Sequence, residues 1–309
     1  MTVAAAVPAT GGGGEGRAAL AAGVACYTAW GLFPLYFQLL GRAGIGPWEI
    51  VGHRTLWAVP AALALVLLAR QGRELLAVLR RPRVLAWLAL STLLIGANWI
   101  VFVLAVNTGR TLDTSLGYYL NPLLNMAAGA VLFRERLDRL GWTAVALAAA
   151  GVVVQAFALG HLPWISLLLA FSFCAYGVVR KRVAVSAQTG LFVECLFFLP
   201  LSGLYVLWLQ STGAGRFTDS PLIAVLLLLS GPLTAGTLAL FAWAARRLHY
   251  STMGFLQFIA PTMTFCIGVA QGEPFTPLRA LSFALIWLGA ALFAFGAWRR
   301  LRAVQPREA

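Results

Sequence analysis

Three ionisable residues, Glu49, His53 and Arg54, lie within six positions of a stretch that is otherwise apolar. Glu49 and His53 are four residues apart, so in a helix they share a face, and Arg54 lies beside it. An arginine inside a bilayer costs about 2.5 to 3.5 kcal/mol and generally faces the bundle interior, where it finds a partner. His53 could carry a proton at physiological pH, but a lone histidine in such a segment is more often a hydrogen-bonded packing residue.

The partner that the sequence offers to Arg54 is Glu194. Pro60 and Pro200 close two similar apolar segments, and aligning these prolines puts Arg54 opposite Glu194. Opposite charges at corresponding positions predict either an ion pair between two halves of the protein or two poles of one substrate site. A guanidinium binds a carboxylate through two parallel hydrogen bonds, so a carboxylate-bearing solute is favoured unless Glu194 already occupies Arg54.

The stretch 106–125, VNTGRTLDTSLGYYLNPLLN, brings polar side chains between two long apolar runs. A polar group left unpaired in hydrocarbon costs about 2 to 7 kcal/mol, so this helix must turn its polar face toward a cavity or another helix. The residues expected to contact a solute by hydrogen bonding or stacking are Trp30, Asn98, Trp99, Tyr118, Asn121, Tyr176 and Gln257. Asn98 could equally join two helices, and Trp30 and Tyr176 could be aromatic residues at the membrane interface.

The composition predicts the class of protein that positions these residues. Hydrophobic residues make up 61% of the 309-residue chain and charged residues 11%, whereas soluble domains contain about 25% charged residues. An apolar helix of about 20 residues spans a bilayer. We therefore expect an all-α integral membrane protein with ten transmembrane helices, near 18–40, 46–69, 83–106, 113–133, 139–158, 162–179, 188–209, 221–245, 251–271 and 276–298.

The basic residues are distributed unequally between the two sides of this ten-helix arrangement. One side holds both chain ends and 18 of the 23 Lys and Arg residues, among them the run 180–182. The other side holds only Arg42, Arg110, Arg216 and Arg279. Cytoplasmic loops are enriched in Lys and Arg, so both termini are predicted to be cytoplasmic. This distribution accounts for the net charge of +13 without a nucleic-acid partner.

Two segments with the same order of residue types indicate an internal repeat. In the stretches 117–135 and 256–273, an aromatic, an aliphatic and a small residue precede Pro122 and Pro261, and a glutamate closes each stretch. Five helices per copy is an odd number, so the copies are inverted, and transporters with inverted repeats bind substrate between them. Both prolines are expected to bend their helices. The predicted units are a disordered tail at 1–17, five-helix repeats at 18–158 and 159–298, and a cytoplasmic tail at 299–309.

Several classes of function lack their motifs in this sequence. The four cysteines have neither CxxC spacing nor a nearby histidine, so we expect no metal, disulfide or cofactor. No phosphate-binding loop is present, which excludes ATP hydrolysis by this chain. No HExxH or GxSxG motif indicates an intramembrane enzyme. A non-transporting scaffold is less favoured, because it would not need polar groups on matched helices.

The sequence also resembles a known family. The motifs AWGLFPLYF, EIVGHRTLW, GANWIVFVLAVNTGRTLDTSLGYYLNPLL, RERLDRLGWTAVALAAAGV and LPWISLLLAFSFCAYGVVRK occur in the order found in RarD-type permeases of the EamA group of drug/metabolite transporters. The similarity extends over about residues 18–298. It implies ten helices in two inverted repeats, a bacterial inner membrane, and export or exchange of a small metabolite or drug. The family provides no agreed set of binding residues, so those named above follow from their chemistry alone.

We therefore expect a secondary transporter, not an enzyme, that moves a small organic solute by alternating access across the lipid bilayer. Protons could drive it through His53 or Glu194. An uncoupled facilitator of amino-acid-like solutes is the alternative, because the membrane segments contain few carboxylates. The sequence indicates no oligomeric state.

Overall fold

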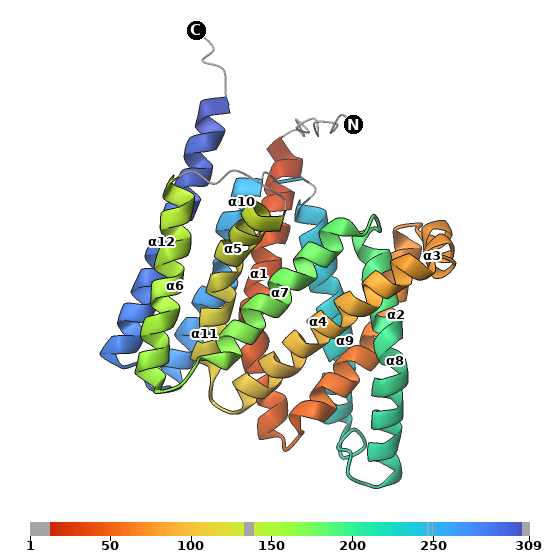
Figure 1. Ribbon diagram of the computed structural model, residues 1–309. Helices are drawn as coiled ribbons and strands as arrows, with labels where there is room; N and C mark the ends of the chain where they lie inside the picture. Colours follow the sequence, from red (N-terminus) through yellow and green to blue (C-terminus); the bar gives the residue numbers. More distant parts are fainter. Residues whose placement is uncertain (1–12, 133–138, 246, 249, 305–309) are drawn as a thin grey trace.

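The computed structural model describes residues 13–132, 139–245, 247–248 and 250–304, and all regular secondary structure in these ranges is helical (Figure 1). The helices are α1 (Gly13–Arg42), α2 (Pro47–Leu68), α3 (Gly72–Leu79), α4 (Pro82–Asn107), α5 (Thr111–Leu132), α6 (Arg139–Leu159), α7 (Trp164–Arg182), α8 (Ala187–Ser211), α9 (Pro221–Ala245), α10 (Tyr250–Leu256), α11 (Ile259–Ala270) and α12 (Pro277–Val304). Eight of these described helices, α1, α2, α4, α6, α7, α8, α9 and α12, are long and apolar enough to cross a membrane.

The helices differ from the predicted ones in three places. α1 begins within the predicted N-terminal tail, and Glu15 in its first turn forms an ion pair with Arg247 at 3.0 Å. α12 continues into the predicted C-terminal tail. α3 lies in the connection after α2, where no helix was predicted. The rest of both predicted tails, 1–12 and 305–309, and the glutamate at 135 lie outside the described residues.

The predicted span at 251–271 is not one continuous helix. Gln257 and Phe258 separate α10 from α11 near the middle of this range. Pro261 weakens the helix at this break, because a proline has no N–H group and the carbonyl oxygen of Gln257, four residues earlier, loses its helical donor. The other predicted bend, at Pro122, lies inside α5, which continues through the proline as one helix.

α5 lies close to α7 and α11, and this contact accounts for part of its polar character. Ser166 Oγ donates a hydrogen bond of 2.7 Å to the Asp113 carbonyl oxygen, and Ser115 Oγ donates one of 2.8 Å to the Pro261 carbonyl oxygen. A Cβ atom at Gly117 would lie 2.8 Å from the Ser166 carbonyl oxygen, so only glycine permits this approach. These polar groups thus find partners on neighbouring helices, as burial in a membrane requires.

Eight of the described helices form a ring, and the short helices α3 and α10 and the long helices α6 and α12 are not part of it. Around the ring, each helix packs against the next in the order α1, α9, α2, α8, α4, α7, α5 and α11. α6 and α12 lie side by side at one edge of the molecule (Figure 1). Ser282 Oγ of α12 donates a hydrogen bond of 2.7 Å to the Gly151 carbonyl oxygen of α6, and a Cβ at Gly289 would meet the Ala144 carbonyl oxygen at 2.8 Å. Small residues thus bring these two helices into close contact.

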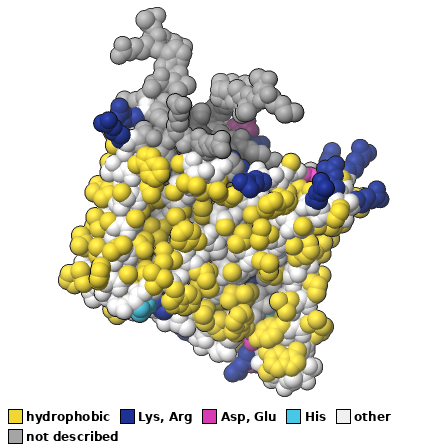
Figure 2. Space-filling model, in the orientation of Figure 1, with side chains coloured by type: hydrophobic (Ala, Val, Ile, Leu, Met, Phe, Trp, Pro, Cys, Tyr) yellow, Lys and Arg dark blue, Asp and Glu magenta, His cyan; other side chains and the backbone are white. Residues whose placement is uncertain are grey.

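The exterior is apolar around its middle and charged at its two ends. Figure 2 shows hydrophobic side chains across the middle of one face, with Lys and Arg near its upper and lower edges. Leu93, Phe157 and Leu201 on three different helices are 70%, 75% and 74% exposed, which suits contact with lipid chains. The start of α1, the end of α12 and α3 lie at one end, called here the α3 end (Figure 1). The connections α1–α2, α4–α5 and α11–α12 lie at the opposite end.

Candidate functional site

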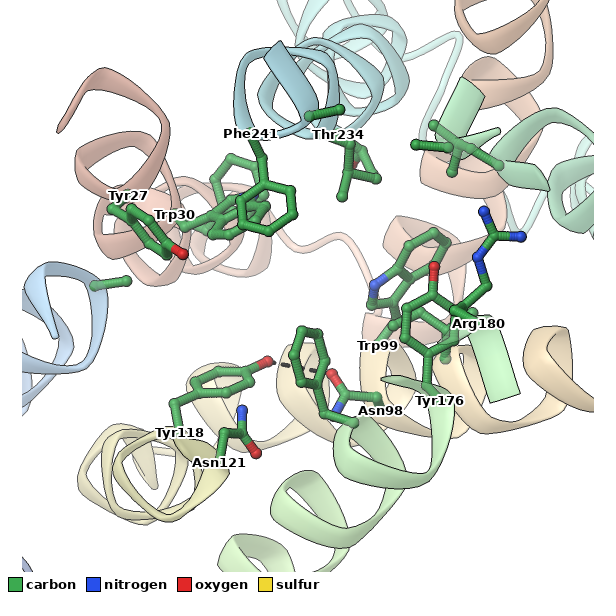
Figure 3. Close-up of a pocket in the computed structure, with 18 of the residues that line it drawn as sticks. Tyr27, Trp30, Asn98, Trp99, Tyr118, Asn121, Tyr176, Arg180, Thr234 and Phe241 are labelled. Carbon is green, nitrogen blue, oxygen red and sulfur yellow. Dashed lines mark hydrogen bonds between the residues drawn. The ribbon is translucent and has the colours of Figure 1, made fainter. Parts of the chain in front are cut away.

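A cavity of about 720 Å³ lies inside the ring of eight helices. All the residues that the sequence analysis assigned to solute binding line it, and they are Trp30, Arg54, Asn98, Trp99, Tyr118, Asn121, Tyr176, Glu194 and Gln257. Pro261 also lines the cavity, whereas Pro122 and His53 do not. Figure 3 shows the labelled side chains, from α1, α4, α5, α7 and α9, facing a common open space. The described lining residues include none from α6 or α12.

Arg54 is the cationic group of the wall that no described carboxylate neutralises. It is 4% exposed, and its Nε donates a hydrogen bond of 2.9 Å to Thr234 Oγ1 of α9. Its guanidinium carbon lies 4.4 Å from the ring centre of Trp99 and 5.2 Å from that of Phe37, and aromatic faces attract a cation. Nη1 has no hydrogen-bond partner, and within the described part of the chain no carboxylate forms an ion pair with Arg54. The guanidinium therefore retains donor capacity that the protein does not use.

Glu194 of α8 is occupied by other groups. Its carboxylate accepts hydrogen bonds from Ser91 Oγ and from the Tyr176 hydroxyl, the latter at 3.4 Å. Arg180 Nη1 lies 3.7 Å from Glu194 Oε1 and forms the ion pair. The direct bridge from Arg54 to Glu194, one of the two alternatives predicted from the sequence, is therefore not formed.

Arg180 is a site residue that the sequence analysis missed. It was assigned to the basic residues that orient the chain, because it begins an Arg-Lys-Arg run at the end of a helix. Its position four residues after Tyr176 puts both side chains on one helix face, and this spacing was the available signal. Phe33 and Phe241 also line the cavity. Their sequence context provides no signal, because phenylalanine is common throughout membrane helices.

Asn98 joins helices at the cavity wall. Its Nδ2 donates hydrogen bonds to the Leu169 carbonyl oxygen at 2.9 Å and to Ser172 Oγ at 3.1 Å. Its Oδ1 accepts a hydrogen bond of 3.2 Å from the Tyr118 hydroxyl, drawn as a dashed line in Figure 3. Asn121 differs, because its Oδ1 is buried without a hydrogen-bond partner. Asn98 therefore connects α4, α5 and α7, while Asn121 retains a free acceptor.

Aromatic rings cover much of the remaining wall. Trp30 and Tyr27 of α1 meet edge to face, with ring centres 5.3 Å apart, and Trp30 lies 5.7 Å from Phe241 of α9. Trp30 Nε1 donates a hydrogen bond of 2.9 Å to Thr237 Oγ1, so its polar atom is satisfied. Tyr176 lies across the open space from this cluster (Figure 3). Walls of this kind suit a solute with a flat or apolar body.

His53 has the contacts of a packing residue. It is 1% exposed, its Nδ1 accepts a hydrogen bond of 3.1 Å from Trp57 Nε1, and its ring stacks on Phe217 with centres 4.9 Å apart. Glu49, on the same helix face, accepts a hydrogen bond of 2.7 Å from the backbone N–H of Arg216. Both side chains therefore bind the α8–α9 connection rather than the cavity.

Hydrogen bonds join the helices at the end opposite to α3. Gln38 of α1 and Gln271 after α11 exchange hydrogen bonds of 3.0 and 2.6 Å between their amides. The Glu273 carboxylate accepts the backbone N–H groups of Thr111 at 2.5 Å and of Leu112 at 2.8 Å. These N–H groups begin α5, where a negative charge is favourable. These hydrogen bonds thus join the first and the second half of the chain.

The cavity reaches the surface at the α3 end. Ser186 and Gln188, in and after the α7–α8 connection, belong to its lining, and the lining residues Asn125 and Ala187 are exposed. The cavity is therefore accessible at the α3 end.

A polar contact holds α3 beside this opening. Glu74 of α3 accepts hydrogen bonds from the Ser186 backbone N–H at 2.8 Å, the Ser186 hydroxyl at 2.5 Å and the Thr189 hydroxyl at 3.2 Å. Burial alone raises the pKa of Glu74, but these hydrogen bonds and the nearby Arg180 outweigh it and hold the pKa below its ordinary value. The carboxylate form is thus the one that the fold stabilises.

The described residues do not form a metal-binding site. These residues contain no group of three or more His, Cys, Asp or Glu side chains that could hold a metal ion. The four cysteines are free.

Comparisons with known proteins agree on one family. Residues 17–157 match the EamA-like transporter family. Protein RarD of Escherichia coli strain K12 is 39% identical over 276 residues, which cover 89% of this chain and 93% of that protein. A Vibrio cholerae protein named as an uncharacterized transporter is 41% identical, over 88% of this chain and 90% of its own.

More distant relatives extend the comparison. A Pseudomonas aeruginosa protein named chloramphenicol-sensitive protein RarD is 33% identical, over 82% of this chain and 86% of its own. A solved crystal structure superposes with a TM-score of 0.57 at 21% identity, covering 89% of this chain and 96% of the other. At that identity the likeness shows the fold alone.

Proposed function

Because this chain belongs to the EamA-like transporter family and is a multi-pass bacterial membrane protein, we propose that it is a secondary transporter of a small carboxylate-bearing organic solute. The observation that carries this proposal is Arg54, a buried cation in the cavity wall with an unused donor and no carboxylate partner within the described ranges.

The charge of the cavity wall supports an anionic solute. Arg54, Arg180 and Glu194 are the charged residues among the described lining. Arg180 and Glu194 form an ion pair with each other, so the positive charge of Arg54 remains in excess. A carboxylate would neutralise it and accept two parallel hydrogen bonds from the guanidinium. The solute's apolar part would lie against Trp99 and the aromatic cluster at Trp30.

The proposed topology has ten membrane spans, with α5 as the fourth and α10 with α11 as the ninth. Two inverted repeats, 18–158 and 159–298, would each contribute five spans. The family match at 17–157 supports this division, because it covers almost the same residues as the proposed first repeat. Both termini and the α3 end would face the cytoplasm of a bacterium, since most Lys and Arg residues belong to that side.

The two ends of the cavity support alternating access. The opening at the α3 end and the hydrogen bonds of Gln38, Gln271 and Glu273 at the opposite end correspond to a state that is open to the cytoplasm. Transport requires a second state in which these bonds are broken and the α3 end is closed. Inverted repeats produce such a pair of states when the halves exchange conformations.

The alternative is an uncoupled facilitator of amino-acid-like solutes. Glu194 is the one carboxylate among the described lining residues, and Ser91, Tyr176 and Arg180 already bind it. A proton carrier must release its proton in one state, and Glu194 could do so only if these contacts change. Proton coupling through Glu194 or His53 is therefore the part of the proposal that an experiment must decide.

The experiment is counterflow and uptake in proteoliposomes with matched solutes. Each radiolabelled aromatic monocarboxylate is compared with its neutral carboxamide, and chloramphenicol is included because the name of one relative refers to it. We expect carboxylates to be transported and the matched amides to be excluded. Uptake that follows an imposed pH gradient would establish proton coupling, and equilibration that ignores the gradient would establish a facilitator.

Equal transport of acid and amide would contradict the assigned role of Arg54. Empty liposomes and liposomes that contain heat-unfolded protein measure passive leak.

A further inference from the structure

α3 and its flanks carry a cluster of exposed arginines. The members of this α3 arginine cluster are Arg70, Arg73, Arg80, Arg81 and Arg83, and every one is exposed. Within the described ranges, no ion pair joins any of them to a carboxylate. Figure 2 shows basic side chains that project from the surface at the corner where Figure 1 places α3.

Three of the four arginines at the opposite end, Arg110, Arg216 and Arg279, are paired instead. Arg110 lies 2.8 Å from the Asp113 carboxylate, and Arg216 lies 3.0 Å from the Asp219 carboxylate. Arg279 lies 3.9 Å from the second oxygen of Asp113. Asp113 and Asp219 thus offset charge at that end, and no carboxylate among the described residues does the same for the α3 arginine cluster.

The one acidic residue within 70–83 does not neutralise the cluster. Glu74 turns toward α8, where it accepts hydrogen bonds from Ser186 and Thr189. Its carboxylate is therefore used to attach α3 to the cavity opening. The arginines on the outer side remain available to an external anion.

The outer face of α3 also carries apolar surface. Arg73, Leu76 and Arg80 are separated by three and four residues, so they share one helix face. Leu76 on this face is 58% exposed, whereas Leu75 and Val78 pack into a buried apolar cluster with the neighbouring helices. A face that combines guanidinium groups with an exposed leucine suits the boundary between lipid headgroups and acyl chains.

We propose that the α3 arginine cluster binds the headgroups of anionic phospholipids and that Leu76 enters the acyl region beside them. Clusters of four or more basic residues next to a membrane span attract anionic lipids by about 1 kcal/mol for each residue. Lipid bound there would hold α3, and Glu74 with it, at the edge of the cavity opening. This effect on the opening rests on the proposed transport function, whereas the lipid binding itself does not.

The test measures lipid preference directly in the full-length protein. Trp87, 41% exposed near the start of α4, is the reporter. Fluorescence quenching by brominated phosphatidylglycerol is compared with quenching by brominated phosphatidylcholine, and a Trp87→Phe variant isolates this residue's signal. We expect phosphatidylglycerol to be preferred. The double variant R73Q/R80Q should reduce that preference by roughly 30-fold, or about 5-fold for each arginine, and salt should weaken it in the wild-type protein.

The matched control removes the same charge from the other end. R42Q/R216Q should leave the lipid preference at Trp87 unchanged. Equal quenching by the two lipids in the wild-type protein, or equal losses in both double variants, would overturn the proposal. Displacement by inorganic phosphate beyond that by chloride at equal ionic strength would also overturn it, because it would indicate a site for free phosphate. None of these outcomes depends on whether transport is observed.

Discussion

Arg54 and Glu194 occupy comparable places on two helices but have different surroundings. Each lies six residues before the proline inside its helix, Pro60 in α2 and Pro200 in α8, and each lines the cavity. Glu194 is held by a serine, a tyrosine and an arginine, whereas Arg54 has a single hydroxyl acceptor and aromatic rings. Similar position in the helix thus does not mean similar use. The satisfied charge stabilises the fold, and the unsatisfied charge is available to a solute.

The largest expected effect comes from removing the unsatisfied charge. Arg54→Ala should reduce transport of a carboxylate at least about 100-fold, because two charge-assisted hydrogen bonds contribute roughly 1.5 to 3 kcal/mol each. Membrane insertion should remain intact, since no ion pair is lost. Arg54→Lys, which retains the charge without the planar fork, should recover only part of the activity. An unchanged counterflow rate in Arg54→Ala would show that Arg54 does not bind the solute, and the contrast drawn between Arg54 and Glu194 would be wrong.

The second effect should appear in stability rather than in transport. Glu194→Gln leaves Arg180 without its carboxylate partner and should lower the free energy of unfolding by about 1 to 3 kcal/mol. Thermal unfolding in detergent measures this loss, and counterflow at a permissive temperature should remain within about tenfold of wild type. If transport were abolished while stability was unchanged, Glu194 would have the role assigned here to Arg54.

A smaller effect is expected from the ring that faces the Arg54 guanidinium. Trp99→Leu removes a cation–π contact, which is worth about 0.5 to 2 kcal/mol. Solute affinity should fall by up to roughly 30-fold, and the salt dependence of binding should stay the same because the charge remains. Trp87→Phe, at an exposed position away from the cavity, is the matched control. Equal losses in the two variants would mean that indole removal acts through general destabilisation.

The smallest effect concerns Glu74. Its carboxylate accepts hydrogen bonds from the protein, as that of Glu194 does, but lies at the molecular surface. Folding lowers the pKa of the Glu74 carboxyl from its ordinary value of about 4.5. The carboxylate therefore stabilises the fold fully at pH values above 4.5. This stabilisation is lost as the pH falls through the lower pKa of the folded protein. Thermal unfolding of wild type and Glu74→Gln should therefore differ at neutral pH and converge in acid. A difference that grew on acidification would show the opposite linkage.

Much of the fold follows from apolar run lengths, but two features do not. The run 251–271 reads as one span, and its break depends on Pro261, whereas Pro122 lies in a helix that stays continuous. A proline removes the same hydrogen bond in both cases, so its presence alone does not predict which helix breaks. α3 is too short for its apolar periodicity to distinguish it from a loop.

The candidate site was predictable where a residue type was unusual for a membrane helix. Arg54, Asn98 and Glu194 were found because polar groups in lipid need partners. Their actual partners could not be predicted, because Arg180 lies on another helix and its approach to Glu194 depends on how the helices pack. His53 has an equally unusual residue type but faces a loop, which the sequence does not reveal.

The close pair α6 and α12 provides a fixed reference for measuring motion. No described residue of either helix lines the cavity, and the contact between Gly151 and Ser282 leaves little room for sliding. Spin labels at Phe157 and Leu281, both exposed on this pair, should report a distance that is insensitive to solute. A third label on a ring helix would then have an internal standard. Distance changes from that label to the pair could be attributed to the ring, without assuming which part of the molecule stands still.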